Sequence, residues 1–269
     1  MRWPCPVRSA PRLAVAAAVV FTGSFLTASD GVKGVGQFNP QDETVELFSA
    51  IEEGKLEVKL IPKDSSQCRV LITNKTEKPL NVSLPDAFAG VPVLAQLQFQ
   101  PAGANNFNNF NNQNNAPQRV GVGNQFGNNL FQGNQGNQLF NIAPEKVAQL
   151  KLTSVCLDHG LPNPRPAMPY EIRPIASVTD KAEVYELCRM LGGGQVSQRA
   201  AQAAAWHLNN EMSWDQLAGL RLKLALGSIT QPFFTPKELA EGKKAAEAAV
   251  GLVEKRQQAA VRDASYKEG

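Results

Sequence analysis

The spacing of apolar residues changes partway along this 269-residue chain, and the change limits the fold more than any other feature. From Lys55 the apolar side chains recur at every second position, as in Leu56, Val58 and Leu60, which is the pattern of a half-buried strand. From about residue 180 they recur with helical spacing. Strands followed by helices, without regular alternation of the two, predict an α+β fold.

The strand-like half predicts an antiparallel, immunoglobulin-like β-sandwich. Its strands are short and evenly spaced, and turns rich in Asn, Asp, Pro and Ser join them, as is typical of a sandwich. A short helix over 43–53 is expected to precede the strands, so this domain covers 43–176. The predicted strands are 55–60, 69–73, 80–84, 91–99, one or two strands within 147–157, and 170–175.

A low-complexity segment interrupts the strand pattern. Residues 104–141 contain 14 Asn, 6 Gln, 5 Gly and 5 Phe, and Arg119 is the only charged residue between Asp86 and Glu145. A segment of this composition buries too little apolar surface to offset the entropy lost on ordering. We therefore expect 104–141 to be a disordered insertion that the sandwich tolerates. It is either an inert spacer or a self-associating arm.

The last third of the chain carries helix start signals. Asp180 with Glu183, Ser213 with Gln216, and Thr235 with Glu238 have the spacing of a capping box. We expect a helical region over 180–260 and a disordered tail over 261–269. The predicted helices are 180–191, 196–209, 213–226 and 236–260.

The N-terminus has the layout of a cleaved signal peptide. Three arginines precede an uncharged run over 13–29, which ends in small residues. We expect a signal peptide over 1–28, a flexible leader over 29–42, and a secreted or periplasmic protein. The alternative is an anchor that stays in the membrane, but the run has only 17 residues, whereas a spanning helix needs about 20 apolar ones.

Charge argues against nucleic acid as a partner. The chain has 27 Lys and Arg against 24 Asp and Glu, and residues 1–28 hold three of the arginines and no acid, so the remainder is 24 against 24. Nucleic-acid binding needs concentrated positive charge, which a neutral chain without a basic cluster does not provide.

The cysteines and histidines offer one candidate catalytic pair. Cys156 and His159 could form a thiol nucleophile with its base, with Asp158 as the residue that orients the imidazole. The structural alternative is a buried cysteine at a strand end followed by a loop histidine. The other histidine, His207, is expected at the edge of a helical core. No dense metal-ligand spacing occurs, so we predict no catalytic, cofactor-binding or metal-binding residue.

The sequence does not determine disulfide pairing. After the predicted cleavage the chain retains Cys68, Cys156 and Cys188, and the sequence favours neither one bridge nor three buried thiols. Trp206 and Trp214 are interpreted as core anchors between helices rather than as a ligand-stacking pair.

Glycine pairs and a heptad spacing carry little functional information. The run 192–194 is expected to connect two helices, because it lacks the Lys-Ser/Thr ending of a phosphate loop. Gly121 and Gly123 lie in the low-complexity insertion and are given no role. Apolar residues seven apart suit a helix partner, but a last helix lying on its own domain is favoured. These four residues are Leu239, Ala246, Val253 and Ala260.

Several segments together resemble a group of exported proteins of unknown function from planctomycete-type bacteria. The residues that carry the resemblance cover much of 44–240 outside the Asn-rich insertion. Because that group has no assigned activity, the resemblance implies a domain organisation and no function. The segments are Ile-Thr-Asn-Lys-Thr-Glu-Lys-Pro-Leu at 72–80, Phe-Ala-Gly-Val-Pro-Val-Leu-Ala-Gln at 88–96, Val-Cys-Leu-Asp-His-Gly-Leu-Pro-Asn-Pro-Arg-Pro at 155–166, Ala-Ala-Gln-Ala-Ala-Ala-Trp-His-Leu at 200–208 and Met-Ser-Trp-Asp-Gln-Leu-Ala at 212–218.

These observations favour an exported, non-catalytic binding or scaffolding protein of the cell envelope. Its expected partner is another envelope protein or a second copy of the chain, and it touches the membrane only through the signal peptide before cleavage. The alternative is a thiol-dependent hydrolase centred on Cys156 and His159. A third hypothesis, a small-ligand sensor, requires an apolar pocket between the sandwich and the helices.

Overall fold

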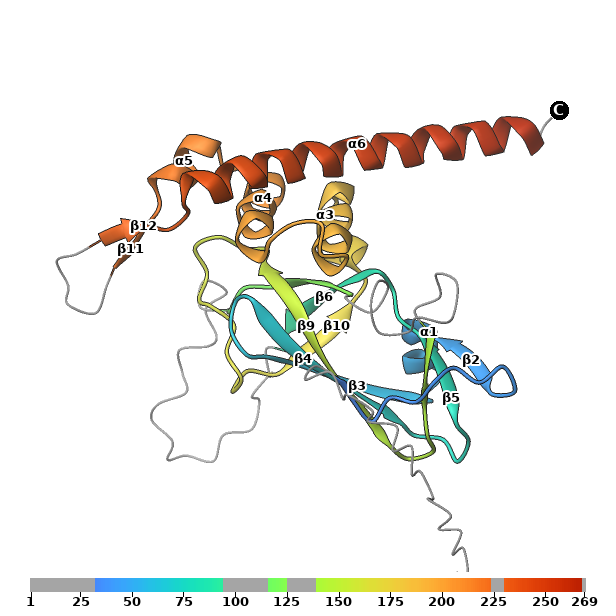
Figure 1. Cartoon of the computed structure of the whole chain (residues 1–269). Helices are drawn as coiled ribbons and strands as arrows, with labels where there is room; N and C mark the ends of the chain where they lie inside the picture. Colours follow the sequence, from blue (N-terminus) through green and yellow to red (C-terminus); the bar gives the residue numbers. More distant parts are fainter. Residues whose placement is uncertain (1–31, 94–115, 125–138, 224–229, 268–269) are drawn as a thin grey trace, which may run out of the picture.

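The computed structural model of the chain describes residues 32–93, 116–124, 139–223 and 230–267. Strands form the lower layer in Figure 1, two helices lie on them, and a long helix crosses above. The predicted signal peptide lies outside the described residues, as do 94–115 and 125–138 of the region predicted to hold a strand and the insertion. No helix among the described residues has both the length and the apolar character needed to cross a membrane.

Six antiparallel strands close into a barrel, with one further strand outside the ring. The order around the ring is β9-β4-β3-β10-β6-β7, and β7 pairs back onto β9, while β1 adds to the outer edge of β9. The strands are β1 Val32–Lys33, β3 Leu56–Pro62, β4 Gln67–Asn74, β6 Ala87–Pro92, β7 Val120–Gly123, β9 Val147–Cys156 and β10 Tyr170–Arg173.

The prediction of an immunoglobulin-like sandwich is therefore wrong, although the α+β composition is retained. The ring closes on the ten-residue strand β9, which pairs with β4 along one side. Along its other side, β9 pairs first with β1, at residues 149–150, and then with β7, at residues 153–156. Its Thr153 pairs with Gln67 of β4 on one side and Gly123 of β7 on the other. Alternation of apolar and polar residues is the same in a sandwich and a barrel, so the period did not distinguish them.

A small second sheet covers one end of the barrel. Its middle strand, β5, pairs in parallel with β2 and antiparallel with β8, and α1 follows directly after β2. The predicted helix over 43–53 is therefore a strand followed by a single short helix. These elements are β2 Glu43–Glu46, α1 Leu47–Glu52, β5 Leu80–Ser83 and β8 Leu139–Ile142.

Helices lie in the part of the chain where they were predicted, with two differences. Helices α3 and α4 pack on the barrel and carry α6, whereas residues 221–223 of the predicted helix 213–226 form a strand that pairs with β12. Helix α6 continues to Lys267, beyond the predicted start of the disordered tail. The elements are η2 Ile175–Ser177, α3 Ala182–Gly192, α4 Gln198–Asn210, α5 Trp214–Gly219, β11 Arg221–Lys223, β12 Thr230–Pro232 and α6 Pro236–Lys267.

Two described strands fall inside the segment 104–141 that was predicted to be disordered. Strand β7 is a member of the barrel, and the first three residues of β8 also lie there. Val120 and Val122 of β7 point into the barrel core, where both are fully buried. The predicted flexible leader likewise contains β1. Tertiary burial, rather than local composition, orders these segments.

Small residues on β7 and α3 allow the helix to contact the barrel. A Cβ atom placed on Gly123 would lie 2.2 Å from the Cys188 carbonyl oxygen and 2.4 Å from the Gly192 nitrogen. A Cβ on Gly121 would lie 2.6 Å from Cys188 Sγ. The two glycines that received no role from the sequence are therefore the surface on which α3 packs.

Candidate functional site

Cys156, the proposed nucleophile, is buried at the end of β9. Its side chain is 1% exposed, and Sγ lies 3.9 Å from the carbonyl oxygen of Ser65. Burial raises the pKa of the thiol to about 12, from an ordinary value of 9.0. Gln202 of α4 binds both the N–H and the carbonyl of Cys156, at 2.8 and 2.9 Å. The residue therefore joins the barrel to α4 with its sulfur protonated at neutral pH.

Asp158, the proposed orienting carboxylate, binds Arg119 instead of a histidine. Its Oδ2 accepts hydrogen bonds from the backbone N–H and from Nε of Arg119, each at 2.9 Å. Arg119 also donates to the carbonyl oxygen of Val178, just before α3. This carboxylate ties the loop after β9 to the start of β7, so it is not available to orient an imidazole.

Both histidines pack against tryptophans. The ring of His159 meets Trp206 edge-on, with centroids 4.7 Å apart, and its backbone N–H donates to Asn210 Oδ1 at 3.1 Å. Burial lowers the pKa of the His159 imidazole. The ring of His207 lies 4.5 Å from that of Trp214, and its Nδ1 is 2.8 Å from the Met212 carbonyl oxygen, so Nδ1 carries the proton.

The core role predicted for Trp206 is confirmed, since it is 6% exposed inside an aromatic cluster, and Trp214 packs partly buried beside it. All three described cysteines are buried and free. No three His, Cys, Asp or Glu side chains within the described part of the chain lie close enough to hold a metal ion. The described cysteines, which could have been nucleophiles, are therefore buried, and the histidines, which could have been bases, pack against tryptophan rings.

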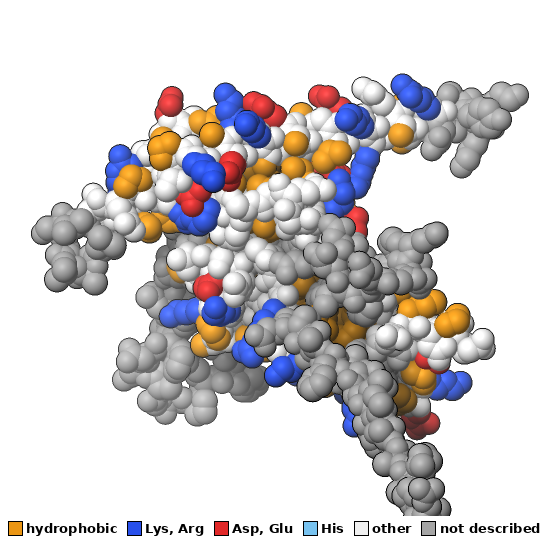
Figure 2. Space-filling model, in the orientation of Figure 1, with side chains coloured by type: hydrophobic (Ala, Val, Ile, Leu, Met, Phe, Trp, Pro, Cys, Tyr) orange, Lys and Arg blue, Asp and Glu red, His pale blue; other side chains and the backbone are white. Residues whose placement is uncertain are grey.

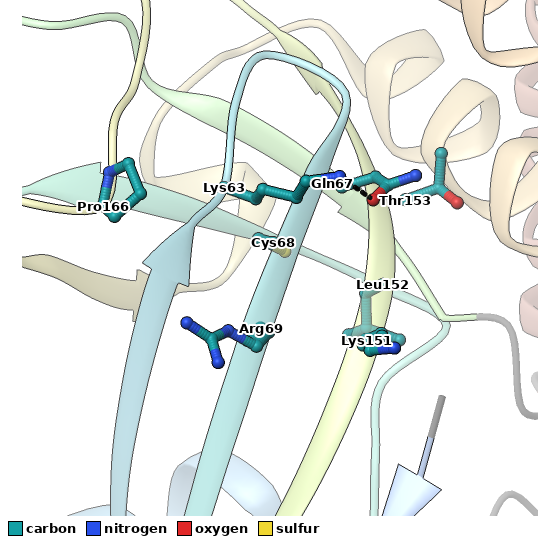
Figure 3. A pocket seen from close by; sticks show the side chains of 8 residues that line it. All are labelled: Lys63, Gln67, Cys68, Arg69, Lys151, Leu152, Thr153 and Pro166. Carbon is teal, nitrogen blue, oxygen red and sulfur yellow. Dashed lines mark hydrogen bonds between the residues drawn. The ribbon is translucent and has the colours of Figure 1, made fainter. Parts of the chain in front are cut away.

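A surface hollow of about 400 Å³ on the barrel is the best candidate for a binding site (Figure 3). It spans three successive rungs of the β4–β9 ladder, Gln67 with Thr153, Cys68 with Leu152, and Arg69 with Lys151. The middle pair is buried and the outer pairs point outwards. The lining residues are Lys63, Gln67, Cys68, Arg69, Lys151, Leu152, Thr153 and Pro166, and this set is called the basic hollow below.

Three cations and no carboxylate line the basic hollow. Lys63, in the turn after β3, extends along the hollow and donates to Gln67 Oε1 at 3.2 Å, while Asp64 lies 4.0 Å from its ammonium group. Arg69 and Lys151 are directly opposite each other on neighbouring strands. Like charges in that relation destabilise a sheet, and an anion bound at Arg69 would reduce the repulsion.

Arg69 is the group best placed to receive an anion. Its exposed side chain makes no ion pair or hydrogen bond with any residue that the structure describes. A guanidinium group presents several donors in a plane and binds carboxylate or phosphate through two of them. The adjacent amide of Gln67 and hydroxyl of Thr153 add neutral hydrogen-bonding groups on the same face.

A second hollow, of about 460 Å³, lies between η2, α3 and α6 rather than against the barrel. Its cations are already paired. Arg256 lies 2.8 Å from the buried carboxylate of Glu186 and over the Tyr185 ring, and Lys181 lies 3.2 Å from Glu211. The Arg256 contacts hold α6 on α3, and the Lys181 pair joins α3 to the end of α4, so we favour the basic hollow as the binding site.

Sequence reasoning missed the basic hollow because its cations come from separate strands. Arg69 and Lys151 are far apart in the chain, and neither belongs to a charge cluster. One signal was present, since β4 and β9 contain basic residues and no Asp or Glu. Comparison of the chain with family models, curated proteins and solved structures found no match.

Proposed function

We propose that this chain is an exported, non-catalytic binding protein of the cell envelope that holds an anionic ligand in the basic hollow. The observation that carries the proposal is Arg69, an exposed cation of the basic hollow whose side chain makes no ion pair or hydrogen bond with any described residue and which lies opposite Lys151. Export is inferred from the N-terminal sequence, and the protein is expected to be secreted or periplasmic.

The burial of the candidate nucleophile supports the non-catalytic part of this proposal. A thiol is nucleophilic as the thiolate, and the pKa of Cys156 is about 12 because of its burial. Its suggested orienting partner, Asp158, is bound by Arg119. These two observations do not favour the thiol hydrolase. A protein partner or self-association stays a prediction.

The test is a titration with small anions at low ionic strength. Citrate and inorganic phosphate are added to the purified chain, and binding is followed by calorimetry. Arg69→Gln should lower the affinity for the tighter of the two about tenfold, because a hydrogen bond to a charged group contributes about 1.5–3 kcal/mol.

The matched control is Lys59→Gln on the neighbouring strand β3. Lys59 is exposed on the barrel but lies 2.9 Å from Glu57 and does not line the basic hollow. This variant should bind as the unaltered chain does. Equal losses in the two variants would show a general charge effect, and no saturable binding of either anion would contradict the proposal.

A further inference from the structure

The positive charge of the basic hollow continues across the next strand. In the pairing of β1 with β9, Val32 lies opposite Leu150 and Lys33 opposite Gln149. Leu150 faces the barrel core and Val32 packs against it, so Lys33 and Gln149 share the outer face. Lys151, two residues beyond Gln149, is on that face too, which makes Lys33 its diagonal neighbour.

Arg69, Lys151 and Lys33 therefore form a line of cations across three adjacent strands, called the basic stripe below. Directly opposite residues have Cβ atoms about 5 Å apart, and diagonal neighbours about 7–8 Å. The basic stripe is then about 12 Å long between its outer Cβ atoms. Three cations on separate strands suit several anionic groups arranged along an extended ligand better than one small anion.

The three strands that carry the basic stripe contribute no acidic side chain to it. Strands β1, β4 and β9 contain no Asp or Glu, and the side chains of Arg69 and Lys33 form no ion pair with any residue in the described ranges. On the neighbouring strand β3, by contrast, Lys59 is 2.9 Å from Glu57. Basic side chains recur over the strand layer in Figure 2, below the helices, where acidic ones are sparse.

The neutral groups beside the stripe indicate the class of ligand. Gln67 and Thr153 form the rung two residues from Arg69 and Lys151, so amide and hydroxyl groups lie next to the cations on one face. A chain of acidic sugars presents carboxylates and hydroxyls together and matches both rungs. Single-stranded nucleic acid is disfavoured because no aromatic side chain lines the basic hollow for base stacking.

We propose that the basic stripe binds an acidic polysaccharide, with its carboxylates on Arg69, Lys151 and Lys33. This inference rests on the proposed function of the basic hollow and adds the ligand class and the direction of binding. Each cation on the stripe holds a separate acidic group. Affinity should therefore rise with the number of sugar units until the stripe is spanned, and it should fall with added salt.

The experiment compares galacturonate with its linear oligomers of increasing length on the purified chain. The oligomers should bind more tightly than the monomer. Lys33→Gln should weaken the longer oligomers about threefold to tenfold and leave monomer binding unchanged, whereas Arg69→Gln should weaken both. Lys59→Gln is the control for net charge, and thermal melts of all variants check that the barrel is intact.

The outcomes separate this inference from the proposed function. If oligomers bind no better than the monomer, or if Lys33→Gln has no effect, the stripe is overturned while the basic hollow stands. If Arg69→Gln changes neither ligand, the hollow itself is overturned. A single-stranded DNA of equal charge that binds as tightly, and with the same dependence on Lys33, would overturn the assignment to acidic sugars.

Discussion

The carboxylate of Asp158 binds the backbone N–H and the guanidinium group of Arg119, and so joins the loop after β9 to the residue that precedes β7. The Leu157 N–H donates to the Arg119 carbonyl oxygen at 2.9 Å in the same place. The only charged residue of a long uncharged stretch therefore contributes to closing the barrel. The role that the structure gives to Asp158 is this contact.

Arg119→Gln should destabilise the fold. The Asp158 side chain is 14% exposed, and loss of its charged partner should cost about 2 kcal/mol of unfolding free energy, measured by urea denaturation. Asp158→Asn should cost a similar amount, and the double variant less than the sum. Arg173→Gln is the control, because its ion pair with Glu171 is exposed and contributes little. Equal effects of Arg119→Gln and Arg173→Gln would contradict the structural role.

Gly123→Ala should destabilise the barrel more strongly than a typical surface change. The added methyl group would overlap backbone atoms of Cys188 and Gly192, which cannot rotate away, so α3 must shift. Overpacking of this kind costs about 1–3 kcal/mol or more. Gly219→Ala is the control, since a Cβ there meets nothing within 4 Å. Thermal melts should show a large fall in Tm for the first variant only, and a small change for both would argue against the close packing of β7 and α3.

The buried thiols should be inert at neutral pH and should make stability fall in alkali. Burial raises the pKa of Cys68, Cys156 and Cys188 to about 12, against an ordinary value of 9.0. A group whose pKa is raised by folding contributes its full stability below pH 9.0. That contribution is lost as the pH rises towards 12, because the unfolded chain then releases protons first.

Thiol labelling and denaturation measure these effects. With Cys5→Ser as the background, a chromogenic disulfide should react slowly with the folded chain at pH 7 and with three thiols in urea. The unfolding free energy should decrease between pH 9 and pH 11, and Cys188→Ala should reduce the slope. Rapid labelling of Cys156 in the folded chain would instead support the thiol nucleophile.

Deletion of 104–141 should abolish cooperative unfolding. The deletion removes β7, which pairs with both β6 and β9, so it opens the barrel ring. The matched control replaces 125–138 with a Gly-Ser chain of equal length, which keeps β7, β8 and the length of the connection. Circular dichroism melts should show a cooperative transition only for the replacement. A cooperative melt of the deletion variant would show that β7 is dispensable.

Local signals in the sequence predicted many elements correctly because their causes lie within a few residues. The alternation over 55–60 became β3, and the capping boxes at Ser213 and Thr235 start α5 and α6 with the expected hydrogen bonds. The box proposed at Asp180 is wrong, because α3 begins at Ala182 and its cap residue, Lys181, makes no side-chain capping bond.

The candidate site could not be found in the same way. Cys156 and His159 are close in sequence, but Cys156 is buried at the end of β9, whereas the His159 ring packs against Trp206. Arg69 and Lys151 are distant in sequence and become neighbours only through the register of β4 and β9. Register depends on which strands pair, and short stretches of alternating residues do not specify their partners.

Strand β7 could not be predicted from the sequence, because contacts with distant parts of the chain stabilise it. The four residues Val-Gly-Val-Gly lie in an Asn-rich region, and glycine weakens a strand, so nothing local predicted one. In the folded chain the two valines fill the barrel and the two glycines receive α3. Apolar period and capping had already determined that strands would precede helices. The barrel closes because both faces of β7 become buried, and burial of apolar surface is favourable. That burial occurs only when distant parts of the chain surround β7.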